Sequence, residues 1–222
     1  MKYSLAISVL SLFVLQSQSA FAKEIPVQAR LFAGMTTVKP DNVNETIEAQ
    51  GLKKMDGISQ LGVEITYPVM KYLDVGARYA KKMASSGEEL VVAADDYQAR
   101  LDQDAFLLIA RVPLKKSDFI RVDIFGGVGG TNTSFKVKTA SLDGELKKSV
   151  GDEWYASPYA AAGASLAFGY KKFYLVLEAG YEYNKIDGFK SSGNPGSIDT
   201  LDLSGGYFTL GLMFDGVPGT VN

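Results

Sequence analysis

The strongest constraint on this chain is an alternation of apolar and polar residues with a period of two, repeated along its length. In 173–184, apolar residues such as Phe173, Leu175 and Leu177 alternate with Glu178, Glu182 and other polar or small residues. Successive side chains of a β-strand point to opposite faces, so each such segment has one apolar and one polar face. The pattern predicts strands at 27–35, 58–67, 73–80, 104–112, 119–130, 156–168, 173–184 and 201–214.

Two of these strands have less distinct faces. The segment 104–112 is apolar on both faces, and 156–168 is dominated by alanine. Their orientation is assigned by pointing Arg111 and Ser165 inward, because a slip of one residue would exchange the two faces.

The connections between the predicted strands alternate in length. The short ones are 68–71, 113–118 and 169–172, and the long ones, polar or charged, are about 37–57, 82–102, 131–155 and 185–200. Short turns at one end and long loops at the other are typical of transmembrane barrels, whereas a β-sandwich or a lipocalin-like cup has no reason to separate them. After the first residues no segment reaches 18 consecutive apolar residues, which excludes a helical membrane protein. The expected fold is all-β: an eight-stranded antiparallel up-and-down transmembrane β-barrel.

Aromatic residues collect at both ends of the predicted strands, as expected for girdles at the two membrane interfaces. Beside the short turns and the last strand end we predict an aromatic girdle of Tyr67, Tyr72, Phe119, Phe168, Tyr170, Phe173 and Phe214. Candidates for a second girdle, toward the long loops, are Tyr79, Phe106, Trp154, Tyr155, Tyr159, Tyr181 and Tyr183.

The N-terminus has the form of a secretory signal peptide. Lys2 supplies the positive start, an apolar run extends from Leu5 to Leu15, and Ala20-Phe21-Ala22 is an A-x-A cleavage site. An uncleaved anchor is the alternative, but the run is short for a spanning helix. We expect a cleaved signal peptide at 1–22, a barrel at 23–214 and a short tail at 215–222. Loss of Lys2 leaves 22 basic and 25 acidic residues, a net charge of −3 that does not favour nucleic acid.

Composition excludes several chemistries. The chain has no cysteine and no histidine. Disulfides, thiolate metal sites and cysteine nucleophiles are therefore impossible, as is any mechanism that needs an imidazole. We expect no cofactor, no metal and no catalytic residue, although a Ser/Lys or carboxylate-only mechanism remains formally open.

Two further motifs have ordinary structural explanations. The run 126–130, Gly-Gly-Val-Gly-Gly, resembles a phosphate-binding loop but lacks the lysine and the following helix, so glycines in a barrel strand are the preferred interpretation. The pairs Glu88-Glu89 and Asp95-Asp96 suit a divalent cation, yet solvated loop charge explains them better.

The period of two points a group of charged side chains into the interior of the barrel. It comprises Arg30, Glu64, Asp74, Arg78, Arg111, Arg121, Asp123, Glu178 and Glu182. The interior of an eight-stranded barrel is just wide enough for side chains to fill, and buried charges must be paired. The sequence favours a polar network that plugs the lumen, with a narrow pore as the alternative.

With these features together, the chain resembles the small outer-membrane barrels of the OmpA transmembrane-domain, OmpX/Ail and OmpW type over 25–214. The resemblance rests on the signal peptide, the strand count, the run from Tyr67 to Gly76 and a last strand closing on Phe214. It implies the Gram-negative outer membrane as location, and membrane lipids, lipopolysaccharide and the outer-membrane assembly machinery as partners. Family barrels usually end at the terminal aromatic, whereas eight residues follow Phe214 here.

Three functions stay open at this point. The first is a structural or surface-interaction barrel whose long loops meet an unidentified extracellular partner. The second is a small passive channel for small or apolar molecules, as in the OmpW-like group. The third is a soluble periplasmic ligand-binding barrel. Enzymes built on similar barrels, among them lipid A acylases and omptin proteases, rely on a histidine that this chain does not have.

Overall fold

A computed structural model describes residues 27–38, 40–87, 98–117, 119–148, 157–170 and 172–216. The expected signal peptide at 1–22, most of the expected tail, and the acidic pairs at 88–89 and 95–96 lie outside these described residues.

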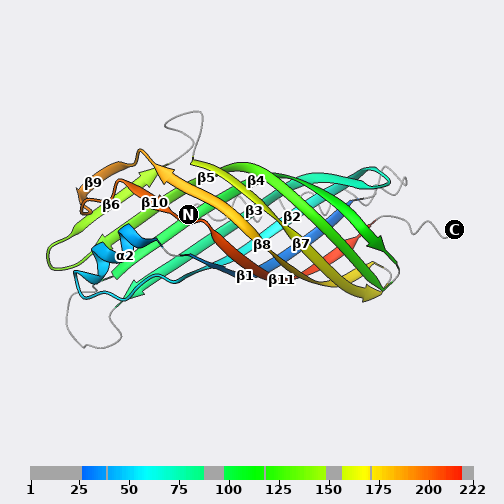
Figure 1. The fold of residues 1–222 in the computed structure, drawn as a ribbon, viewed down its shortest axis with the longest axis horizontal. Coiled ribbons are helices and arrows are strands. Elements are labelled where there is room, and N and C mark those ends of the chain that lie inside the picture. Colours follow the sequence, from blue (N-terminus) through cyan, green and yellow to red (C-terminus); the bar gives the residue numbers. More distant parts are fainter. Residues whose placement is uncertain are drawn as a thin grey trace, which may run out of the picture.

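The described chain is almost entirely antiparallel β-structure with one short helix (Figure 1). The elements in chain order are β1 (Gln28–Thr37), α2 (Asp41–Glu48), β2 (Gly57–Met70), β3 (Leu73–Gly87), β4 (Gln98–Lys116), β5 (Ile120–Lys138), β6 (Asp143–Lys148), β7 (Ser157–Tyr170), β8 (Phe173–Asp187), β9 (Lys190–Asn194), β10 (Thr200–Asp202) and β11 (Gly205–Asp215).

Eight of the strands close into a ring, in the order β1, β2, β3, β4, β5, β7, β8 and β11. Each pairs antiparallel with the next, and β11 pairs back onto β1 with Gln28 opposite Asp215. A closed ring leaves no unpaired strand edge along the wall. The predicted eight-stranded antiparallel up-and-down barrel is confirmed.

The alternation in the sequence becomes an alternation of exposure around the wall. In β1, Leu31 and Met35 are 57% and 59% exposed, whereas Arg30, on the other face of the same strand, is 4% exposed. The less distinct strands follow the expected faces, with Arg111 and Ser165 buried and Phe106 and Leu108 exposed. The run 126–130 lies inside β5, which continues as a strand to Lys138, so it is not a phosphate loop.

The two ends of the barrel are built differently. The short turns join β2 to β3, β4 to β5 and β7 to β8, and the register shifts there at Pro68 and Pro113, which cannot donate to the ladder. At the other end the predicted long loops are partly ordered structure. Strands β3, β4, β5 and β8 run beyond their expected ends, and α2, β6 and β9 are added. The single strand expected at 201–214 is divided into β10 and β11, with a break at 203–204.

We call the long-loop-end parts of β3, β4, β5 and β8, together with α2, β6, β9 and β10, the extension. Along it the outward face of the wall changes from apolar to charged. In β4, Phe106 and Leu108 face outward and are exposed, but the next outward positions toward the long-loop end are Asp104, Asp102 and Arg100. Over the same stretch the inward side chains change from Arg111 to apolar ones, ending in Leu101 and Ala99. The outward face is therefore apolar on the barrel wall and charged on the extension.

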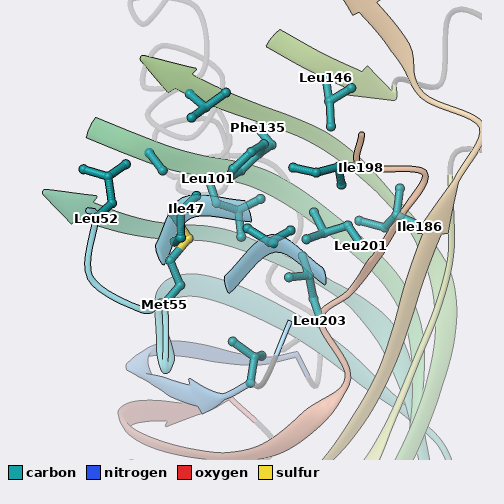
Figure 2. Close-up of a cluster of buried hydrophobic side chains, with 14 of the residues drawn as sticks. Ile47, Leu52, Met55, Leu101, Phe135, Leu146, Ile186, Ile198, Leu201 and Leu203 are labelled. Atoms are coloured by element: carbon teal, nitrogen blue, oxygen red, sulfur yellow. The ribbon is translucent and has the colours of Figure 1, made fainter. Parts of the chain in front are cut away.

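The extension has its own apolar core, which covers the mouth of the barrel (Figure 2). We call this cluster the cap. It consists of Val38, Val43, Ile47, Leu52, Met55, Ile58, Ala99, Leu101, Phe135, Val137, Leu142, Leu146, Ile186, Ile198, Leu201 and Leu203.

Helix α2 forms part of the cap and owes its place to packing. Its first turn has no side-chain cap, and eight residues are too few for a stable isolated helix. Val43 and Ile47 are 1% and 0% exposed. The side-chain amide of Asn44 binds the segment after the helix, because Met55 N donates a hydrogen bond to Asn44 Oδ1 at 2.9 Å.

Candidate functional site

The candidate site is the interior of the barrel, where the wall residues bring charge together. All nine inward polar residues named from the sequence are buried: Arg30, Glu64, Asp74, Arg78, Arg111, Arg121, Asp123, Glu178 and Glu182. Eight of them form one connected network, and Glu182 belongs to a second cluster.

Glu64 is the hub of the network. Arg111 reaches its Oε1 from Nε at 2.5 Å, and Arg78 reaches Oε2 at 2.7 Å. Arg30 lies 3.7 Å away on the same carboxylate. Such charge-assisted contacts are the strong class of hydrogen bonds, and here they occur without access to bulk water. One carboxylate thus holds side chains from three strands, β1, β3 and β4.

Glu178 bridges the same two arginines from the opposite side. Arg78 and Arg111 each approach its carboxylate at 2.7 Å. The hydroxyl of Tyr207 donates to Oε1 of Glu178 at 3.2 Å, the same oxygen that Arg78 approaches. Both carboxylates are therefore shared by both guanidinium groups, which gives a four-membered ring of alternating charge across the lumen.

Aromatic rings pack against the guanidinium groups. The Arg78 guanidinium lies 4.7 Å from the ring centroid of Phe32 and 5.2 Å from that of Phe125, and Arg111 lies 4.5 Å from Phe125. Gly62 is required beside Phe32, because a Cβ there would lie 2.3 Å from the ring. These stacking contacts add attraction to the ion pairs and leave the side chains little freedom.

A second branch extends the network toward the short turns. Arg121 contacts Asp74 at 2.5 Å and Asp123 at 2.7 Å. Asp123 also accepts from Arg30 at 2.7 Å, which joins the branch to Glu64. Arg121 also lies 3.8 Å from Asp215, which pairs with Lys116 at 3.3 Å. The network therefore contains four arginines, one lysine and five carboxylates, so its formal charges cancel. A neutral, fully paired set is the arrangement in which buried charge is tolerated.

A separate cluster lies toward the cap. Lys82, which is 0% exposed, donates to Glu182 at 2.5 Å and to the Tyr159 hydroxyl at 3.1 Å. Tyr159 in turn donates to Glu182 at 2.6 Å. Tyr159 is therefore not part of an outer girdle, as the sequence suggested, because its side chain points into the barrel and is 5% exposed.

Lys82, Tyr159 and Tyr207 also point into the barrel and contact these carboxylates, and they were not predicted as members of the network. The signal for Lys82 was available, since it continues the inward series of Arg78 and Ala80 in β3. It was missed because the strand was expected to end at residue 80. The structure extends β3 to Gly87.

Little room remains between these layers. The cavity beside Arg30, Arg78 and Glu178 has a volume of about 10 Å³, the space of a single water molecule at most. Under the cap, the space lined by Met55, Leu101 and Phe135 has a volume of about 0 Å³. Charged, aromatic and apolar layers thus follow one another along the lumen.

The outside of the barrel carries the aromatic residues expected at the short-turn end. All seven are exposed: Tyr67, Tyr72, Phe119, Phe168, Tyr170, Phe173 and Phe214. Phe119 and Tyr170 stack with ring centroids 5.6 Å apart, and Phe173 meets Phe214 at 5.3 Å across the β8–β11 pair. Of the second group, Tyr79, Phe106, Tyr181 and Tyr183 face outward, and Trp154 and Tyr155 lie outside the described residues.

Within the described ranges, no group of three or more acidic, histidine or cysteine side chains is placed to hold a metal ion. No helix in the described part of the chain is long and apolar enough to cross a membrane.

No family model matches this chain, and no curated protein matches its sequence. Solved structures similar to it include Ail, the attachment invasion locus protein of Yersinia pestis, at 16% identity over 85% of this chain and 97% of that one, with a TM-score of 0.41. OprG from Pseudomonas aeruginosa has 16% identity over 85% and 94%, with a TM-score of 0.46. The outer membrane protease OmpT from Escherichia coli has 8% identity over 90% and 99%, with a TM-score of 0.39. These neighbours are outer-membrane β-barrel proteins, the group that the sequence resembles.

Proposed function

We propose that this chain is a β-barrel of a Gram-negative outer membrane that is closed to passage and acts through its long-loop end. The outer wall supports the membrane location. Its outward face is apolar over nine residues of β4, from Phe106 to Leu114, and over eleven residues of β8, from Phe173 to Tyr183. A tilted strand needs about 9–11 residues to cross a bilayer.

The size of the apolar surface argues against the soluble alternative. Side chains such as Leu108 and Leu212 are 72% and 64% exposed, and neighbouring strands continue the same apolar face around the ring. A soluble monomer rarely exposes a contiguous apolar patch of more than a few hundred Å². In lipid the same apolar surface has no unfavourable contact with water. The closed ring also provides hydrogen-bond partners for the backbone N–H and C=O groups of the wall.

The filled lumen is the observation that carries the closed-barrel proposal. A conducting pore needs a continuous water path, whereas here the paired charges around Glu64 and Glu178 cross the lumen and the cap covers its mouth. Opening such a path would separate buried ion pairs or expose the cap. We therefore favour a structural or surface-interaction barrel over the channel alternative.

The charged extension is the part of the molecule offered to the exterior. Its core is packed against the barrel mouth, and its outward residues are charged, as in Arg100, Asp102 and Lys136. A folded, water-compatible surface on a rigid base is suited to binding a partner outside the cell. The partner itself stays unassigned, and no enzymatic role is proposed.

The route to the membrane completes the proposal. We infer export through the signal peptide at 1–22, cleavage after Ala22, and insertion by the assembly machinery using the last strand with Phe208, Leu210, Leu212 and Phe214. Outer-membrane lipids and lipopolysaccharide would then surround the apolar wall.

Two measurements test this proposal. In cell fractionation, the folded chain should stay with outer membranes, resist SDS unheated and shift on a gel after boiling. A freely soluble periplasmic species with no shift would refute the membrane location. In planar bilayers, the wild-type barrel should show no steady single-channel conductance, and reproducible conductance would put the channel first.

A further inference from the structure

Among the described residues of the short-turn end, the exposed charged side chains are all positive. Lys71, Lys115, Lys116 and Lys172 are exposed in the three short turns. The described acidic residues at this end are buried and paired: Asp215 with Lys116 at 3.3 Å, and Asp74 with Arg121 at 2.5 Å. We call the four lysines the basic rim. The sequence of the same turns adds Lys171 and one acid, Asp118.

The opposite end shows no such bias. Over the described ranges, its exposed bases and acids are equal in number, eight of each. The bases are Lys53, Lys54, Arg100, Lys136, Lys138, Lys147, Lys185 and Lys190, and the acids are Asp41, Glu45, Glu48, Asp56, Asp143, Asp187, Asp199 and Asp202. The positive field therefore belongs to one rim and is not a property of the whole surface.

The girdle sets the depth of the basic rim. Each lysine-bearing turn also carries exposed aromatics, such as Tyr72 in the first turn, Phe119 in the second and Tyr170 in the third. Lys71 Nζ lies 5.3 Å from the ring centroid of Tyr72. Aromatic girdles sit at the level of lipid headgroups, so the lysine ammonium groups lie beside the phosphates of that leaflet.

The lysines are also spread around the barrel. Their turns join β2 to β3, β4 to β5 and β7 to β8, which are separate places along the ring of eight strands. A shell of lipid molecules contacts every side at once.

We propose that the basic rim binds the anionic headgroups of phospholipids in the leaflet at the short-turn end, such as phosphatidylglycerol. This inference rests on the proposed membrane function. Each lysine near an anionic lipid surface is worth about 1 kcal/mol, or roughly a fivefold local enrichment. Averaged over a lipid shell that also includes uncharged stretches, we expect roughly a two- to fivefold preference for anionic over neutral lipid.

The test measures lipid selectivity on the folded full-length mature barrel in phosphatidylcholine vesicles. Spin-labelled phosphatidylglycerol or phosphatidylcholine is added in trace amounts, and the immobilised fraction of each is read by electron paramagnetic resonance. The wild type should immobilise the anionic label preferentially. About 1 M salt, where the screening length is about 3 Å, should remove most of this preference.

Two triple variants of equal charge separate the rim from the whole molecule. Lys71→Gln/Lys115→Gln/Lys172→Gln should bring the preference close to one. Lys53→Gln/Lys136→Gln/Lys147→Gln, at the opposite end, should retain it. Lys116 is left unchanged because it pairs with Asp215.

The outcomes distinguish this inference from the proposal beneath it. Equal preference in both triple variants, or loss in the long-loop variant, would overturn the role of the basic rim, as would a wild type that inserts without any preference. An acidic protein partner for the rim would give that last result. Failure of the wild type to enter neutral vesicles at all would instead refute the membrane proposal.

Discussion

Arg78 offers the sharpest test of the closed lumen. Its guanidinium contacts Glu64 and Glu178 at 2.7 Å each and lies between the rings of Phe32 and Phe125. In Arg78→Ala both carboxylates stay buried, and Arg111 is then the one close arginine that they share, instead of Arg78 and Arg111. Breaking a buried pair by removing one partner typically costs about 3–5 kcal/mol.

The magnitude depends on what remains around the two carboxylates. Glu64 keeps Arg111 and the more distant Arg30, and Glu178 keeps Arg111 and the Tyr207 hydroxyl. Because each acid retains one close partner, we place the expected loss for Arg78→Ala within that range of about 3–5 kcal/mol rather than above it.

Arg100→Ala is the matched control. Arg100 also meets a carboxylate at 2.7 Å, that of Asp102, but its side chain is 56% exposed. An exposed pair of this kind contributes about 0–1 kcal/mol. Equilibrium unfolding in urea, followed on the folded barrel in vesicles, gives both free energies of unfolding from the linear extrapolation. Equal small losses in the two variants would mean that water solvates the lumen, and the closed-barrel argument would fail.

Three further changes probe the wall, the cap and the second polar cluster. Leu108→Arg, near the middle of the apolar wall, should lower the free energy of unfolding in vesicles by about 2–4 kcal/mol, against about 0–1 for Leu114→Arg near the short-turn interface; equal costs would contradict the assigned depth. Ile47→Ala should destabilise the cap by about 2–5 kcal/mol and speed amide exchange over 41–56, whereas the exposed Glu48→Ala should leave exchange rates unchanged, and no difference between them would show that α2 is not packed. Lys82→Met should cost about 3–5 kcal/mol in unfolding titrations by leaving the buried carboxylate of Glu182 without its cation, and a loss below about 1 kcal/mol would contradict the role of this buried ion pair.

The sequence was sufficient for the barrel wall because the period of two is read directly from residues such as Arg30, Leu31 and Phe32. No register shift occurs between the short turns and the extension, so one assigned residue orients a whole strand. The lumen set followed from the same rule. Which arginine meets which carboxylate did not, because partners such as Arg78 and Glu178 are 100 residues apart and depend on the stagger of the closed ring.

The cap could not be predicted by the same search, for a physical reason. The period of two identifies a wall strand by its apolar outward residues, but beyond Phe106 the apolar side chains of β4 are inward ones, such as Leu101. Helix α2 is too short for its own periodicity to be recognised, and it forms because Val43 and Ile47 find a core made by distant strands.

In the proposed membrane location, the exchange of faces in β4 also determines the depth at which the barrel lies in the bilayer. Strands advance about 3.3 Å per residue, so sinking the barrel by one repeat of two residues would carry Asp104 and its partner Lys81, whose Nζ lies 3.3 Å away, toward hydrocarbon. Rising by the same step would bring apolar residues of the wall, such as Phe106, into water. Asp104 therefore opposes a deeper position and Phe106 opposes a shallower one, although the two residues are only two positions apart on β4. The change from Phe106 to Asp104 therefore fixes the depth of the barrel in the membrane. Deleting two residues of β4 between this point and the short turn would keep every side chain on its face and would shift the change relative to the membrane.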